Sequence, residues 1–367
     1  MHPTSLYIHI PFCARKCAYC DFASYAGREG DFARYLAGLE QEMLAAARRY
    51  GRLIVPTIYI GGGTPSILKS DALVHLIAMA RALFEVESDA EVTVEANPGT
   101  LNPAMLRELR AAGVNRLSMG MQAAQPHLLG LLGRIHNQAD VEQSVQWARA
   151  AGFDNLSLDL MYALPGQTMA DWVDTLKAAM ALRPDHLSCY SLILEPGTPL
   201  ALQVASGALE TPDEDATLAM QHAAARILAR RGYARYEISN YALPGHTCRH
   251  NEIYWTRGDY LGLGLSAHSQ MNGERFANTD ALDDYLSGVR EISREIITAE
   301  AAREEAIMLG TRTARGIAPA LVAGQDQALA RLTALGLIER TAGRLGLTDK
   351  GLDVHNAVVL ELVGRGP

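Results

Sequence analysis

Two kinds of apolar pattern alternate along the first 200 residues of the chain. Runs rich in β-branched and other apolar side chains predict strands over residues 6–10, 55–60, 91–95, 115–121, 155–160 and 186–194. Between these runs, apolar side chains recur every three or four residues, which predicts helices over residues 31–50, 70–84, 103–112, 140–151 and 169–182. Strands that alternate with helices are typical of a parallel sheet with right-handed crossovers. The pattern therefore predicts an α/β fold with six strand–helix units.

Six such units predict a partial (β/α)6 barrel of the TIM-like type over residues 1–200. The alternation then stops. Residues 201–300 are predicted to form an extension with a helix over 213–231, a short strand over 233–238 and a loop over 244–255. Residues 301–367 predict helices over 301–313 and 325–335, a hairpin over 337–347 and a last helix over 348–363. This order indicates a C-terminal α+β module that is winged-helix-like.

Three cysteines lie within eight residues, directly after the first predicted strand, at positions Cys13, Cys17 and Cys20. Cysteine thiolates are the usual ligands of iron–sulfur clusters, and three of them fill three corners of a [4Fe–4S] cube. The fourth iron would stay open for a small molecule, as in catalytic rather than structural metal sites. A disulfide would leave one thiol over, and a zinc site would need a fourth ligand, for which only His9 is near. The spacing therefore favours a cluster with one open iron.

Polar side chains are predicted at the ends of several strands. A Gly-Gly-Gly-Thr-Pro segment follows the second strand, and Glu95, Gln122 and Asp159 lie at the carboxyl ends of the third, fourth and fifth. In α/β barrels this face carries the active site. Carboxylates accept hydrogen bonds from ammonium or hydroxyl groups, and Arg134 can pair with a carboxylate. Each residue alone is more often a turn or a rim ion pair, but together they predict a ligand site.

Charge and hydropathy narrow the classes of function. The net charge of -8 argues against a general nucleic-acid-binding protein, and the C-terminal module has nearly balanced charges, which favours a structural or lid role. No apolar stretch is long enough to span a bilayer, and the first residues lack the features of a signal peptide. We therefore expect a cytoplasmic protein, in a compartment where thiols are kept reduced.

The cysteine spacing and the glycine segment together resemble the radical S-adenosylmethionine (SAM) superfamily. The resemblance implies that the three cysteines hold a [4Fe–4S] cluster whose open iron binds the amino and carboxylate groups of SAM. It further implies an electron donor, since one-electron reduction cleaves SAM to methionine and a 5′-deoxyadenosyl radical. By position, it implies SAM contacts from the following residues: Tyr7, Tyr19, Gly62, Gly63, Thr64, Glu95, Gln122, Arg134 and Asp159.

A narrower resemblance covers nearly the whole chain. Residues 6–13, 94–98, 116–122 and 159–165 resemble the oxygen-independent coproporphyrinogen III oxidase group. The oxidase itself carries a further cysteine two residues after the third ligand, where this chain has Phe22, and an N-terminal extension. Residues 248–255 instead match the His-Asn-x-x-Tyr-Trp signature of the HemW branch, whose members are described as heme chaperones. The alternative activity is the oxidative decarboxylation of coproporphyrinogen III to protoporphyrinogen IX.

Membership of that branch would imply heme as cargo and heme-accepting respiratory apoproteins, some of them membrane-bound, as partners. The protein would then contact the membrane only peripherally. Imidazole and thiolate are ordinary axial ligands of heme iron, so His250 and Cys248 are heme-site candidates, and Tyr254 and Trp255 are candidates to cover the porphyrin. The plain alternatives are a turn histidine and a small buried cysteine. Cys189 lies in a predicted strand and is expected in the core, and no catalytic residue is assigned.

Overall fold

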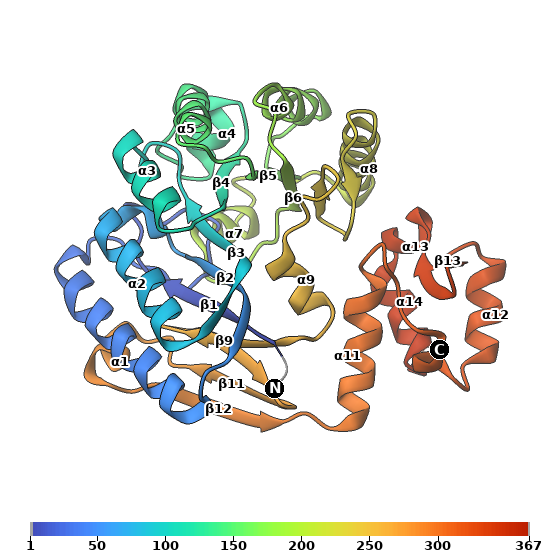
Figure 1. The fold of residues 1–367 in the computed structure, drawn as a ribbon. Coiled ribbons are helices and arrows are strands. Elements are labelled where there is room, and N and C mark those ends of the chain that lie inside the picture. The colour runs from blue at the N-terminus through green and yellow to red at the C-terminus, as the bar shows by residue number, and fades with distance from the viewer. Residues whose placement is uncertain (1–2, 366–367) are drawn as a thin grey trace.

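A 12-stranded sheet is the centre of the computed structural model, which describes residues 3–365 (Figure 1). Its strand order is β12-β11-β10-β9-β1-β2-β3-β4-β5-β6-β8-β7. The strands are β1 (Thr4–Ile10), β2 (Ile54–Gly62), β3 (Glu85–Ala96), β4 (Arg116–Gln122), β5 (Leu156–Tyr162), β6 (His186–Ser191), β7 (Ala234–Arg235), β8 (Asn240–Ala242), β9 (Asp259–Leu263), β10 (His268–Met271), β11 (Glu274–Asn278) and β12 (Glu291–Ile296).

Strands β1 to β6 pair consecutively and in parallel, which confirms the predicted partial (β/α)6 arrangement. Helices cover the outer face of these strands (Figure 1). They are α1 (Phe32–Tyr50), α2 (Ser70–Leu83), α3 (Pro103–Ala111), α5 (Gln138–Ala150), α6 (Met169–Ala181) and α8 (Glu214–Ala229). The main apolar core lies between the outer face of the strands and this ring of helices.

Local sequence explains where these helices form. On α1, Leu39 and Met43 are four residues apart and fully buried, as expected for the apolar stripe of an amphipathic helix. Asn137 begins α5 and Thr168 begins α6, each in a capping box with an aspartate three residues later. The first residues of these helices therefore provide acceptors for their own free backbone N–H groups. Packing of the apolar face against the sheet further stabilises each helix.

The region after residue 200 continues the same sheet at both edges. Strand β9 pairs in parallel with β1, with Gly262 beside Tyr7, and β10 to β12 follow as antiparallel strands. At the other edge β8 pairs antiparallel with β6. The strand predicted over residues 233–238 was wrong in length, because only β7 is extended and a turn closed by Tyr236 N–H to the carbonyl of Asn240 follows it. The division of the chain at residues 200 and 300 stays a prediction.

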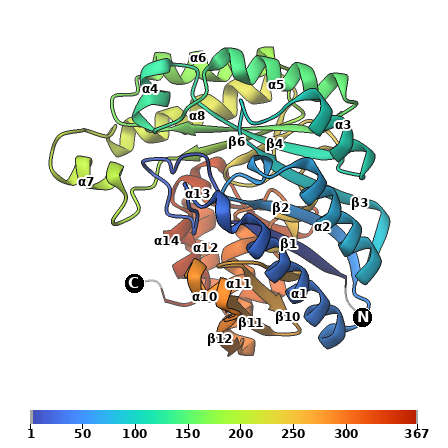
Figure 2. The same ribbon diagram turned by 90° about the vertical axis from the view of Figure 1, so that its left-hand side faces the viewer.

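The last part of the chain lies to one side of the sheet in Figure 1 and behind it in Figure 2. It has an apolar core of its own. The predicted order of helices and a hairpin is confirmed, although the last helix is divided where Val354 leaves helical geometry. The elements are α11 (Ala299–Thr311), α12 (Asp326–Ala334), β13 (Ile338–Thr341), β14 (Arg344–Leu347), α13 (Asp349–Asp353) and α14 (His355–Leu362). The short helices before them are α4 (Pro126–Leu131), α7 (Pro199–Ala205), α9 (Arg249–Trp255) and α10 (Leu282–Ser287). Between residues 3 and 365 no helix is both long and apolar enough to cross a bilayer.

Candidate functional site

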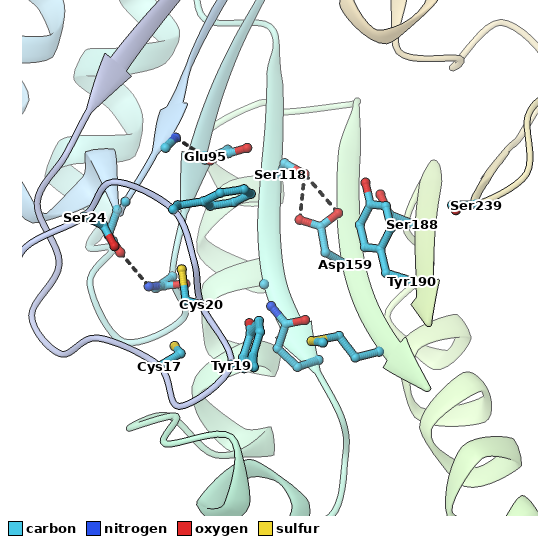
Figure 3. Close-up of a pocket in the computed structure, with 18 of the residues that line it drawn as sticks. Cys17, Tyr19, Cys20, Ser24, Glu95, Ser118, Asp159, Ser188, Tyr190 and Ser239 are labelled. Atoms are coloured by element: carbon cyan, nitrogen blue, oxygen red, sulfur yellow. Dashed lines mark hydrogen bonds between the residues drawn. The ribbon is translucent and has the colours of Figure 1, made fainter. Parts of the chain in front are cut away.

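A cavity of about 770 Å³ lies inside the partial barrel, between the cysteine loop and strands β1 to β6. The loop contributes Cys17, Tyr19 and Cys20 from one side, and β5 and β6 contribute Asp159 and Tyr190 from the other (Figure 3). The structure brings to this cavity all three cluster candidates and all nine SAM candidates predicted from the sequence. These are Cys13, Cys17, Cys20, Tyr7, Tyr19, Gly62, Gly63, Thr64, Glu95, Gln122, Arg134 and Asp159.

Backbone hydrogen bonds hold the cysteine loop over the cavity. Ala18 donates its N–H to the carbonyl of Leu132 (3.0 Å) and accepts the N–H of Leu200 (2.9 Å). All three thiols are free and partly exposed. Two polar groups reach them, since the Thr64 hydroxyl lies 3.5 Å from the sulfur of Cys13 and the Arg134 guanidinium lies 3.4 Å from the sulfur of Cys17.

Three thiolates with hydrogen-bond donors beside them suit three corners of an iron–sulfur cluster. Within residues 3–365 there is no group of three or more His, Cys, Asp or Glu side chains already arranged as a metal site. His9 is not available as a fourth ligand for zinc, because its two ring nitrogens lie 3.0 Å from the hydroxyl of Tyr7 and 3.0 Å from the carbonyl of Ala23.

The glycine segment passes directly beneath the cysteine loop. Gly63 donates its N–H to the carbonyl of Ile10 (2.8 Å), and a Cβ there would lie 2.6 Å from the carbonyl oxygen of Phe12. Gly62 has φ +111°, and a Cβ there would collide with the ring of His9. Close packing of the chain therefore requires glycine at both positions.

The two rim carboxylates are buried and accept hydrogen bonds from neighbours. Glu95 accepts the hydroxyl of Tyr59 (2.6 Å) and the N–H of Gly62 (3.0 Å), and burial raises its pKa to about 7. Asp159 accepts the hydroxyl of Ser118 (3.1 Å), and burial also raises its pKa. The placement of Asp159 at a strand end was wrong, because β5 continues past it to Tyr162. Both side chains can accept hydrogen bonds from a ligand.

The pairing of Arg134 with a ligand carboxylate stays a prediction. Arg134 donates to the carbonyl of Gly120 (2.9 Å) and to the side-chain oxygen of Asn97. Gln122 ends β4 with φ 64°, in the left-handed region that few side chains adopt. Both Gln122 and Arg134 line the cavity.

Residues 249–255 form helix α9, so the loop predicted there was wrong. The helix begins beneath Glu91 of β3, which accepts the backbone N–H groups of Arg249 (3.1 Å) and His250 (3.0 Å). A carboxylate at this position satisfies free N–H groups and favours the positive end of the helix dipole. The cap comes from a distant strand, so the helix has no local start signal.

The four heme candidates divide into two pairs. His250 and Tyr254 line the cavity, whereas Cys248 and Trp255 do not. His250 is 1% exposed, with its ring nitrogens 2.7 Å from the hydroxyl of Thr57 and 2.8 Å from that of Tyr254, and burial lowers its pKa to about 3.

Cys248 is fully buried, and burial raises its pKa to about 12. Its thiol donates to Glu91 (3.6 Å). Trp255 lies under the guanidinium of Arg312, 4.2 Å from the ring centre, next to the C-terminal module. As the structure stands, neither ligand candidate is free to bind iron, and their roles stay predictions.

Comparison with known proteins decides the family. The radical SAM superfamily matches residues 7–179. This chain is 36% identical to the heme chaperone HemW of Bacillus subtilis, in an alignment that covers 98% of this chain and 99% of that protein. It is also 36% identical to HemW of Mycobacterium tuberculosis (strain ATCC 25618 / H37Rv), in an alignment that covers 99% of this chain and 95% of that protein. The chain belongs to the HemW family of radical SAM proteins.

The structure of coproporphyrinogen III oxidase (HemN) from Escherichia coli, described as a radical SAM enzyme, has the same fold as this HemW-family chain. The TM-score is 0.85 at 25% identity, over 99% of this chain and 90% of that one. Membership in the radical SAM superfamily implies a [4Fe–4S] cluster and SAM. The three thiols and the polar lining of the cavity fit both groups.

Sequence reasoning missed several residues that line the cavity of this HemW-family protein: Tyr59, Arg116, Ser118, Ser188 and Tyr190. A signal for some of them was present in β4, where polar or small residues at every second position alternate with Leu117, Met119 and Met121. In a strand, such alternation separates one face from the other. Cys189 was predicted in the core, and it is 4% exposed.

Proposed function

We propose that this protein is a heme chaperone, which binds heme and delivers it to respiratory-type apoproteins. The observation that carries the proposal is similarity over nearly the full chain to proteins named heme chaperone HemW. We further propose that the recipients include membrane-bound proteins, that an electron donor reduces the cluster, and that the protein is cytoplasmic with peripheral membrane contact. The C-terminal module would act as a structural or lid element and not as a nucleic-acid-binding unit.

In this proposal Cys13, Cys17 and Cys20 ligate three irons of the cluster, which when bound supplies one-electron reduction of SAM. The hydroxyl of Thr64 and the guanidinium of Arg134 already point at two of these sulfurs and would stabilise thiolate charge. The nine SAM candidates would surround the ligand between the glycine segment and strands β3 to β5. Glu95 and Asp159 would accept its hydroxyl or ammonium hydrogens.

A second candidate is coproporphyrinogen III oxidase activity, which the likeness in fold to HemN supports. Phe22 weighs against it, because the resemblance implies a further cysteine at this position in the oxidase, two residues after the third cluster ligand. Its side chain is 67% exposed at the cavity, on the loop that carries the thiols.

Anaerobic reconstitution of the cluster, followed by SAM, reductant and coproporphyrinogen III, separates the two candidates. We expect stoichiometric heme uptake and transfer to a heme-free recipient, with no protoporphyrinogen formed. Turnover of coproporphyrinogen would sink the chaperone-only proposal.

The proposed heme role of His250 has its own test. His250→Ala should weaken heme binding about tenfold or more and leave the absorbance of the cluster intact. Tyr254→Phe is the matched variant, because it removes the hydroxyl beside Nε2 and should leave heme affinity equal or higher. Unchanged heme affinity in His250→Ala would show that the assignment of this histidine is wrong.

A further inference from the structure

One buried charge lies at the inner end of the cavity, at the opposite end of β4 from the cysteine loop. Arg116 begins β4, is 2% exposed, and lines the cavity. Its Nε atom is buried without a hydrogen-bond partner. A buried polar group without a partner is costly, and a charged one more so, unless an acceptor arrives. The Nε–H is therefore a donor that the fold does not use, on a side chain that lines the cavity.

Three carboxylates lie near this guanidinium, but each accepts its hydrogen bonds from other groups. Glu91 accepts two backbone N–H groups of α9 (3.0 and 3.1 Å), Glu95 accepts a tyrosine hydroxyl (2.6 Å), and Asp159 accepts a serine hydroxyl (3.1 Å). Each of the three carboxylates interacts electrostatically with the Arg116 cation. They compensate the charge of Arg116, which lets it stay buried, and leave the Nε–H without an acceptor.

The position of Arg116 along the strand indicates which ligand it meets. Gln122, at the other end of β4, is roughly 20 Å away along the strand and lies at the end of the cavity where Arg134 contacts the cysteine loop. A carboxylate bound to the open iron belongs at that upper end. The free donors of Arg116 therefore suit a carboxylate of a second ligand that reaches the inner end of the cavity.

The lining between these ends suits a flat, largely apolar ligand. Aromatic side chains of Tyr7, Tyr59 and Tyr254 surround the inner part, and Met161 and Ile193 lie on the wall formed by β5 and the segment after β6. Heme has this chemistry, because its macrocycle is planar and apolar and its charges are confined to two propionates. Arginine matches a carboxylate with two parallel hydrogen bonds.

We propose that Arg116 binds a propionate carboxylate of heme, with the macrocycle entering the cavity edge-first. This inference rests on the proposed function as a heme chaperone and adds the group that orients the cargo. It predicts that affinity depends on a free propionate as well as on iron.

The test compares hemin with hemin dimethyl ester, in which both propionates are esterified, on the anaerobically reconstituted protein. The wild type should bind hemin about tenfold or more tightly than the ester. Arg116→Gln should bind hemin and the ester about equally. Arg116→Lys should keep part of the preference for hemin, because an ammonium group keeps the charge but cannot form the two parallel hydrogen bonds of a guanidinium. The matched control is Arg15→Gln, since Arg15 is exposed on the cysteine loop and lines the same cavity. It should keep the full preference.

Each outcome has one meaning. If the wild type binds neither compound, the proposed function fails; if it binds both equally, only the inference about Arg116 is overturned. Because the ratio is taken within each variant, a loss of stability does not imitate the effect, and Arg116→Lys decides the matter if Arg116→Gln does not fold. A parallel titration with SAM and decarboxylated SAM assigns the carboxylate. Selective loss of the preference for SAM in Arg116→Lys, with the hemin preference intact, would contradict the proposal.

Discussion

The cysteine loop and helix α9 carry the same kinds of metal-binding side chain and present them in opposite ways. Cys13, Cys17 and Cys20 are partly exposed toward a cavity and have no disulfide partner. Cys248 is fully buried and donates to Glu91, and His250 has hydrogen-bond partners at both ring nitrogens. The difference teaches that residue type marks a candidate ligand, whereas exposure and free lone pairs decide whether it can bind a metal. By that criterion the thiols of the loop can bind a metal directly, whereas His250 must first lose one of its two hydroxyl partners.

The largest effect should come from the loop. Replacing Cys17 with Ser removes one of the three proposed iron ligands, so cluster content after anaerobic reconstitution should fall to near zero. Iron and sulfide analysis with the visible spectrum measures this. Cys248→Ala is the matched control and should keep full iron content, because that thiol lies outside the cavity. A Cys17→Ser protein with normal iron would remove the distinction between the two regions.

The second largest effect should be a loss of stability when helix α9 loses its cap, Glu91. Glu91→Gln removes the charge that accepts two N–H groups of α9 and balances Arg116, so the free energy of unfolding should fall by about 3 kcal/mol. Urea denaturation measures the change. Asp89→Asn is the control, because the Asp89 side chain is 79% exposed and its ion pair with Arg249 should contribute less than about 1 kcal/mol. Equal effects in both variants would show that Glu91 is not a structural cap.

The smallest effect concerns pH. Burial lowers the pKa of His250 to about 3, below the value of roughly 6.5 in an unfolded chain. Between these values the unfolded state binds a proton that the native state does not, so this histidine makes stability fall as pH falls. Between about pH 5.5 and 4 this difference of one proton makes the free energy of unfolding depend on pH with a slope of about 1.4 kcal/mol per pH unit. His250→Gln should remove that contribution to the slope. Denaturation at several pH values tests it, with His268→Gln, a substitution of an exposed histidine, as the comparison variant.

The barrel was predictable because its signals are local. In the first 200 residues each helix buries one face and each parallel strand buries most of its side chains. Both kinds of burial are visible in the sequence as the spacing of apolar residues within the element itself. The cysteines were predictable for the same reason, since a short segment carries all three. The glycine segment was found too, but its packing role was not, because the ring of His9 that requires Gly62 is far away in sequence.

Helix α9 and the inner part of the cavity depend on long-range partners. The carboxylate that caps α9 lies 159 residues earlier, on β3, so nothing near His250 marked a helix start. Trp255 meets its cation, Arg312, only when the C-terminal module packs beside it. Arg116 was missed although β4 alternates regularly, because a buried arginine facing inward is recognised only when the other strands are in place.

Strand β1, which leads into the cysteines, has one neighbour close in sequence and one far away. It pairs with β2 and, about 250 residues later, with β9. At ribosomal rates that interval takes roughly 10 to 50 s. During synthesis β1 is therefore an unpaired apolar edge, and such edges are prone to pair with other chains. A fragment that stopped after the sixth strand would keep this unpaired edge. A cluster inserted during translation would therefore bind before β9 has paired with β1. The last third of the chain is thus needed to complete the sheet around the first strand.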